Sequence, residues 1–297
     1  MPSHEIQWFP GHMAKTRRLI SENLKNVDVV IEILDARIPH SSKNPEIKKL
    51  CADKPTIILL NKSSLADPAV TKFWADKYTN DNTICIETDC ITGKGVEKLP
   101  DAIKKLLSRK IERYDNRGMS GRSVKAMVLG IPNVGKSSLI NKLCGNKKAK
   151  VENRPGVTLD KQWVSTNIGI LLLDMPGILW PKFEDRFVGE NLAITGAIKD
   201  DVLDIETIAT ALVARLRRAY PELLAARYKL DDINKYEELS DYDLLLLIGK
   251  KRGCLISGGE VDSERVANLV IDEYRAAKIG RISLDKNYED RKEPSDA

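Results

Sequence analysis

Residues 124–144 have the sequence VKAMVLGIPNVGKSSLINKLC, and this stretch decides the fold. The run 124–129, apolar except for Lys125, predicts a strand, and the apolar spacing within 136–144 predicts a helix. Between them, residues 130–137 match the pattern GxxxxGKS of a phosphate-binding loop. The strand, loop and helix context makes a chance glycine-rich turn a remote alternative.

In such a loop the glycines let backbone N–H groups wrap the phosphates, and the start of the helix adds partial positive charge. Lys136 is expected to reach the β- and γ-phosphates, and Ser137 to ligate Mg²⁺. The other residues predicted to contact the phosphates adjoin these two: Asn133, Val134, Gly135 and Ser138.

A second motif, DMPG at residues 174–177, follows the apolar run 168–173. Asp174 can hold the metal through a water molecule, while the Gly177 N–H meets the γ-phosphate. Between the two motifs lies a loop that needs a γ-phosphate-sensing threonine, and Thr158 is the candidate second hydroxyl on Mg²⁺. An ordinary Pro-Gly turn followed by a surface threonine is the alternative for that loop.

Asn61 and Lys62 follow the apolar run 56–60 and match the base-reading motif of GTPases. Asn61 is expected to steady neighbouring loops, and the Lys62 stem to lie across the base. Two positions after the lysine this motif carries an aspartate that accepts two N–H groups of guanine, and here that position is Ser64. Charge-assisted hydrogen bonds are about twice as strong as neutral ones. We therefore expect weakened guanine affinity and selectivity, unless Asp67 or a water substitutes.

A second base-contacting loop is expected after the predicted strand 83–87. The candidate is the backbone around Asp89 and Cys90, just before the glycines at 93 and 95.

The order of these motifs is unusual, because in ordinary GTPases the phosphate loop comes before the base-reading motif. Here the parts are cyclically rearranged, so that residues 174–181 lead directly into the C-terminal part of the chain. The polar stretch 114–123, which contains two glycines, is where the old chain ends would be joined.

Apolar runs alternate with helical patterns up to about residue 144, which predicts an α/β fold with a parallel sheet wrapped by helices. We therefore assign residues 1–185 to a circularly permuted P-loop GTPase domain. Helical patterns alone follow, at 205–220, 242–251 and 263–278, and predict a small all-α domain over 186–285. Residues 286–297 have the composition of a disordered tail.

Composition narrows the class of protein. Of the 297 residues 42% are hydrophobic and 31% charged, and no apolar run approaches the roughly 18 residues that span a bilayer. We expect no stable membrane association and, without a signal-peptide pattern, a cytoplasmic protein. Five scattered cysteines predict neither disulfides nor a zinc site. The net charge of +5 is compatible with an RNA partner.

Four further stretches complete the pattern: WFPGHM at 8–13, DARIP at 35–39, GILWP at 177–181 and KRGC at 251–254. With them, the chain resembles the circularly permuted GTPases of the YlqF/YawG type, and among them the ribosome biogenesis GTPases. The resemblance implies a monomer with a GTP- and GDP-binding domain followed by a helical RNA-binding domain. It also implies that the protein binds precursors of the bacterial large ribosomal subunit and their rRNA in the GTP state, and hydrolyses GTP on maturation.

The resemblance bears on catalysis as well. Position 178, where signalling GTPases place a water-orienting glutamine, is Ile178, which cannot orient water. The resemblance implies that His12 supplies this function, whereas a lone histidine without that context is more often structural. Asn133 matches an asparagine that helps bind K⁺ in related GTPases, with a turn residue as the alternative.

Two other functions remain open at this stage. One is a nucleotide-dependent RNA-binding scaffold in which Ser64 and Ile178 mark eroded guanine selectivity and hydrolysis. The other is a GTPase that serves signalling away from the ribosome.

Overall fold

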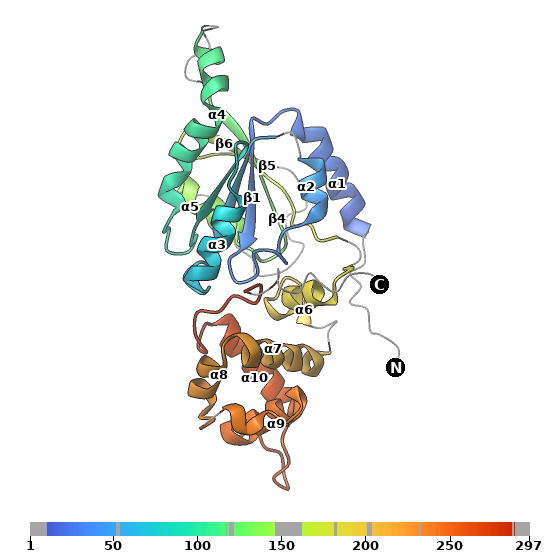
Figure 1. Ribbon diagram of the computed structural model, residues 1–297. Helices are drawn as coiled ribbons and strands as arrows, with labels where there is room; N and C mark the ends of the chain where they lie inside the picture. The colour runs from blue at the N-terminus through green and yellow to red at the C-terminus, as the bar shows by residue number, and fades with distance from the viewer. Residues whose placement is uncertain are drawn as a thin grey trace, which may run out of the picture.

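Branched apolar runs in the N-terminal part of the chain form a twisted sheet (Figure 1). The computed structural model describes residues 11–51, 54–116, 118, 122–145, 162–180, 183–200, 204–231, 233–286 and 288. Within this part, six strands pair in the order β3-β2-β1-β4-β6-β5. Their bounds are β1 (Val29–Asp35), β2 (Thr56–Asn61), β3 (Thr83–Glu87), β4 (Val124–Gly130), β5 (Gln162–Ser165) and β6 (Ile170–Asp174).

Helices cover both faces of the sheet because side chains alternate in direction along each strand. Val30 and Leu34 of β1 pack towards one face, in cores shared with α1, α2 and α3. Ile31 and Ile33 pack towards the other face, with α4 and α5. The helix bounds are α1 (Gly11–Leu24), α2 (Pro45–Leu50), α3 (Pro68–Tyr78), α4 (Leu99–Asp115) and α5 (Lys136–Cys144), with a short 3₁₀ turn η1 (Val96–Lys98) before α4.

Five of the strands are parallel, and β5 pairs antiparallel with β6 at one edge of the sheet. The carboxyl ends of the parallel strands therefore meet along one side of the sheet. Open α/β sheets bind ligands in the crevice outside this side. The strands that end there carry the predicted motif residues: Asn61 ends β2, Gly130 ends β4 and Asp174 ends β6.

The C-terminal part is helical, as predicted, and lies below the sheet in Figure 1. Aspartate side chains before three of its helices accept hydrogen bonds from first-turn N–H groups: Asp185, Asp204 and Asp262. No helix in the described ranges is long and apolar enough to cross a membrane. The bounds are α6 (Arg186–Ile194), α7 (Ile205–Ala219), α8 (Pro221–Tyr228), η3 (Ile233–Tyr236), α9 (Asp241–Arg252) and α10 (Ser263–Arg275).

One strand and two α-helices were not predicted from the sequence. The strand β5 has only four residues, too few for a clear alternation. The helical pattern predicted at 205–220 ends just before Pro221, and this proline begins α8, because proline suits the first turn of a helix. The helix α6 contains Gly189, which weakens its helical pattern.

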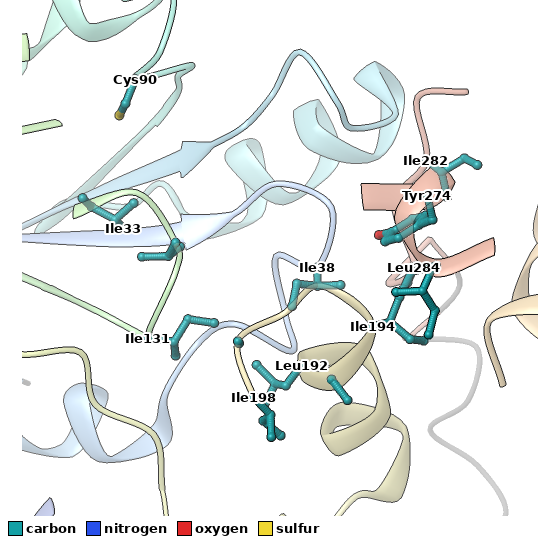
Figure 2. Close-up of a cluster of buried hydrophobic side chains, with 14 of the residues drawn as sticks. Ile33, Ile38, Cys90, Ile131, Leu192, Ile194, Ile198, Tyr274, Ile282 and Leu284 are labelled. Atoms are coloured by element: carbon teal, nitrogen blue, oxygen red, sulfur yellow. The ribbon is translucent and has the colours of Figure 1, made fainter. Parts of the chain in front are cut away.

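The helix α6 joins the two parts of the chain. Leu192, Ile194 and Ile198 lie in one buried cluster with Ile38 and Ile131 from the sheet side (Figure 2). This continuous apolar core means that the helical part packs directly against the carboxyl edge of the sheet.

The chain then returns to the sheet domain after α10. We call residues 281–285 the return segment. The Ile282 N–H donates to the Leu65 carbonyl at 3.2 Å, and the Leu284 N–H donates to the Arg37 carbonyl at 2.7 Å. Loops that follow β1 and β2 are thereby tied to the end of the helical part.

Two described residues fall in the segment expected to be a tail, and both make contacts. Tyr288 stacks on His40 with ring centroids 3.7 Å apart, and its hydroxyl donates to Asp185. Lys286 donates to the Ala219 carbonyl. An aromatic ring that stacks in this way orders its backbone, so the packed part of the chain extends at least to Tyr288.

Candidate functional site

The phosphate loop connects β4 to α5 and lies against the end of β2. Gly135 has φ +105°, a conformation that side chains disfavour, and a Cβ there would lie 2.2 Å from Asn61 Nδ2. The loop therefore needs glycine both for its backbone and for the close approach of Asn61. Val134 is buried beneath the loop, while Ser137 and Ser138 lie half-buried in the first turn of α5.

Lys136 is buried at the start of α5. Its ammonium donates to the carbonyls of Gly130 at 3.1 Å and Ile131 at 2.7 Å. Burial lowers the pKa of Lys136 to about 8, although the nearby carboxylate of Asp174 opposes the shift. A Cβ placed on Gly177 would lie 3.0 Å from the same ammonium, so the two predicted motifs meet at this lysine.

Asp174 lies beside Val128 in the pairing of β6 with β4, at the edge where the phosphate loop begins. Burial raises the pKa of Asp174, and Lys136 acts in the opposite direction. A carboxylate and the Ser137 hydroxyl at one strand edge are hard oxygen donors, which fit Mg²⁺. The third predicted ligand, Thr158, lies outside the described residues.

Asn61 ties the phosphate loop to the loop after β3. Its amide nitrogen donates to the Val134 carbonyl at 2.7 Å, and its amide oxygen accepts from the Cys90 N–H at 2.9 Å. Asn61 is 3% exposed, so both contacts are shielded from water. The structure thus brings together three of the predicted loops around one side chain.

Lys62 lies along the phosphate loop with φ +61°. Its ammonium donates to the Asn133 carbonyl at 2.8 Å and to Asp35 Oδ2 at 2.9 Å. Asp35 also accepts two side-chain bonds from Arg37, at 2.9 and 2.7 Å. Despite full burial, Arg37 and Lys62 hold the pKa of Asp35 far below its usual range.

Asp35 was not singled out as a site residue from the sequence. It lies within the DARIP stretch, and it directly follows a buried strand. An acidic residue at the carboxyl end of a parallel strand could have been recognised as a site candidate.

Ser64 and Asp89 are hydrogen-bonded partners. The Ser64 hydroxyl donates to Asp89 Oδ2, while Asp89 Oδ1 accepts from the backbone N–H groups of Ile91 and Thr92. Burial raises the pKa of Asp89, but these hydrogen bonds outweigh it, and the pKa lies below the usual value.

Asp67, the residue first considered as a substitute for the missing aspartate, is engaged elsewhere. One carboxylate oxygen caps α3 by accepting from Ala69, and the other accepts from the Tyr220 hydroxyl at 3.0 Å. Its contacts therefore direct it to the helical part.

Asn133 contacts the helical part. It has φ +57°, which asparagine tolerates, and its amide donates to the Gly196 carbonyl, just after α6, at 2.8 Å. Arg275 of α10 donates to the carbonyls of Ala193 and Ile194 at the end of the same helix.

Ile178, which follows the DMPG motif, contacts both α1 and the phosphate loop. Ile178 is 1% exposed and shares a core with Ile20 and Leu24 of α1. Its N–H donates to the Gly130 carbonyl of the phosphate loop. The aliphatic side chain at position 178 is therefore part of the packing beneath the loop.

The helix α1 begins at the site. Only residues 25–28 separate it from β1, so it runs antiparallel to β1 and starts at the edge where β1 ends (Figure 1). The backbone of His12 lies in the first turn of α1, whereas its side chain lies outside the described residues.

Comparisons with known proteins agree with this geometry. Residues 125–248 match a family model described as a 50S ribosome-binding GTPase. The match begins at β4, so Asn61 and Lys62 precede it. Ribosome biogenesis GTPase A of Priestia megaterium is 47% identical over 281 residues, 94% of this chain and 96% of the relative.

Solved structures of YlqF extend over nearly the same length. The GDP-bound structure of TM YlqF has a TM-score of 0.62 and 27% identity, and covers 90% of this chain and 98% of that one. GNP-bound YlqF from T. maritima has a TM-score of 0.60 and 28% identity, with 91% and 97% coverage. Both nucleotide states have therefore been seen on a similar chain.

Proposed function

Since the chain belongs to the family of ribosome biogenesis GTPase A, and is thus a GTPase of ribosome biogenesis, we propose that it acts late in assembly of the bacterial large ribosomal subunit. In its GTP state it binds the precursor particle, and it hydrolyses GTP when the particle matures. The description of the matching family model, a 50S ribosome-binding GTPase, supports the choice of subunit.

One observation carries the proposal: the γ-phosphate-sensing motif and the helical part are joined at the phosphate loop. Asn133 of that loop donates to Gly196, and Ile131 packs in one core with Leu192 and Ile198. A rearrangement around the γ-phosphate therefore acts directly on α6 and the helices that pack against it.

The catalytic residues act by positioning and charge. Lys136 exchanges its bonds to Gly130 and Ile131 for bonds to the β- and γ-phosphates. Ser137, Thr158 and Asp174 would hold Mg²⁺, which would supply positive charge to neutralise the phosphates. The Gly177 N–H donates to the γ-phosphate, and Asn61 keeps the loops in register.

His12 orients the attacking water in this proposal. Ile178 cannot do so, because its side chain is aliphatic and 1% exposed in the core under the loop. The 14 residues of α1 span about 21 Å, close to the length of the seven-residue β1, so the first turn of α1 lies level with the carboxyl edge. Particle binding then brings the imidazole to the γ-phosphate.

K⁺ is a second proposed ion. The amide nitrogen of Asn133 donates to the Gly196 carbonyl, so its amide oxygen is the atom that would ligate K⁺. Faster hydrolysis in KCl than in NaCl would support this role, and equal rates in the two salts would exclude it.

The RNA-binding surface is proposed on the helical part. Lys250 and Lys278 are exposed there and suit phosphate contacts. Lys251, Arg275 and Arg281 are less suited, because they donate to carbonyls within the protein.

The test measures phosphate release with and without precursor large-subunit particles, and co-sedimentation under a non-hydrolysable GTP analogue or GDP. We expect particle-stimulated release and co-sedimentation that is stronger with the triphosphate analogue. A signalling GTPase would not co-sediment, and an RNA-binding scaffold would co-sediment without hydrolysis. His12→Ala should lose the stimulation but keep co-sedimentation, with His4→Ala as the matched control from the same N-terminal segment.

A further inference from the structure

Guanine recognition requires two acceptors, because the base presents an N1–H and a 2-amino group side by side. The usual base-reading motif supplies both from one carboxylate, and this chain has Ser64 at that position. The loop after β3 nevertheless brings a carboxylate to the same place. Asp89 accepts a hydrogen bond from the Ser64 hydroxyl, although the two residues are 25 positions apart.

We propose that Ser64 and Asp89 together form the guanine-recognising pair, with Ser64 Oγ and Asp89 Oδ2 each accepting one N–H of the base. This assignment rests on the proposed function only in that the nucleotide is GTP. It makes Asp89 a specificity-determining residue that the usual motif does not contain.

The hydrogen bond between the two side chains determines which of their atoms can accept hydrogen bonds from the base. Since the Ser64 proton is directed to Asp89, the lone pairs of Oγ are left to accept from the base. The carboxylate also strengthens the hydroxyl as an acceptor by polarising it. Asp89 Oδ2 keeps a second lone-pair direction after accepting from Ser64.

Two backbone N–H groups fix the orientation of Asp89. Its Oδ1 accepts from Ile91 at 3.0 Å and from Thr92 at 3.1 Å, so the carboxylate cannot rotate freely. The next residue, Cys90, donates its N–H to Asn61, the base-reading asparagine. Asp89 is 5% exposed, so bonds to its carboxylate are partly shielded from water.

Other groups near the base are unsuitable. Asp67 caps α3 and accepts from Tyr220. Burial raises the pKa of the Cys90 thiol to about 12, so it stays protonated and is a weak acceptor. Asp89 is thus the carboxylate that is bonded directly to position 64.

Two substitutions can distinguish a base-recognising role of Ser64 and Asp89 from a purely structural contact between their loops. Asp89→Asn keeps an oxygen for the N–H groups of Ile91 and Thr92, and replaces the other oxygen by a donor. We expect GDP affinity to fall roughly ten- to a hundred-fold while ADP affinity is unchanged. Xanthosine diphosphate, which carries a carbonyl in place of the 2-amino group, should bind more tightly to this variant than to the wild type.

Ser64→Asp provides the sharper arm of the test. If Asp89 is the acceptor, a second carboxylate within hydrogen-bonding distance repels it, so Ser64→Asp alone should not improve the preference for GDP over ADP. Adding Asp89→Asn to Ser64→Asp should restore or exceed the wild-type preference. Asp67→Asn is the matched control, and should leave the GDP to ADP ratio unchanged.

The measurement is calorimetric titration of the full chain with GDP, IDP, ADP and xanthosine diphosphate. IDP lacks the 2-amino group and should lose less affinity than GDP in Asp89→Asn. Tenfold stronger guanine preference in Ser64→Asp alone, or an unchanged GDP to ADP ratio in Asp89→Asn, would overturn the assignment. Because no ribosomal particle enters this experiment, its outcome is independent of the test of large-subunit assembly.

Discussion

Asp35→Asn tests how the buried charges under the base-reading loop stabilise the protein. Asp35 is the common partner of Arg37 and Lys62, whose side chains are 3% and 21% exposed. Asparagine has nearly the same shape and keeps one oxygen for the Arg37 backbone N–H. The substitution therefore removes the charge and leaves two cations without their shared counter-ion.

The expected cost follows from burial. Removing one partner of a buried ion pair typically costs about 3–5 kcal/mol, because an uncompensated charge remains in a region that water cannot reach. Arg37 meets this condition, since both members of its pair are 3% exposed. We expect unfolding free energy to fall by about 3–5 kcal/mol, with GDP affinity reduced because Lys62 loses its anchor.

Asp28→Asn is the matched control at the other end of β1. Asp28 pairs with Lys110, whose side chain is 40% exposed, so its loss should cost about 1 kcal/mol or less. Urea unfolding followed by tryptophan fluorescence suits both variants, because all four tryptophans precede residue 186. If Asp35→Asn lost no more stability than Asp28→Asn, the argument from burial would be wrong.

Three further predictions concern the loop and its contacts. Gly135→Ala should abolish GDP binding in calorimetric titration, since its Cβ would lie 2.2 Å from Asn61 Nδ2. Gly169→Ala is the control: Gly169 also has a positive φ, of +75°, but its Cβ would meet no atom, so this variant should bind GDP normally. Above pH 8 the free protein loses the Lys136 proton that phosphate binding requires, so GDP affinity should fall by up to about tenfold per pH unit. A GDP affinity that stays constant up to about pH 9.5 in calorimetric titration would contradict this. Arg275→Ala removes two hydrogen bonds to carbonyls at the end of α6, and should lower the free energy of unfolding by about 1–3 kcal/mol. A decrease of less than about 0.5 kcal/mol in urea unfolding would contradict this prediction.

The sheet and the phosphate loop could be predicted because their determinants are local. The run 124–129 is apolar except for Lys125, and the helix start at Lys136 is specified by the loop motif itself. The predicted bounds of the strand 83–87 and the helix 136–144 agree with the structure at both ends. In contrast, α6 is stabilised by its burial against Ile38 and Ile131, which a local pattern does not contain.

The base-binding region shows the same limit. From the sequence, Ser64 was recognised as a departure from the motif, with weakened guanine affinity expected unless Asp67 or a water substitutes. Asp67 was considered because that residue is near in the chain, whereas the fold directs it towards Tyr220. Asp89 reaches Ser64 through the parallel pairing of β2 with β3, a contact that sequence distance conceals.

The helical part is connected to the sheet domain at two loops besides the covalent link that follows the γ-phosphate-sensing motif. The helical part contacts the phosphate loop through Asn133 and Gly196, and the return segment contacts the base-reading loop through Arg281, which donates to the carbonyls of Ser63 and Ala66. A rigid helical part that is held at both loops can fit only one distance between them. Nucleotide-dependent movement of the phosphate loop relative to the base-reading loop must therefore break one of these contacts.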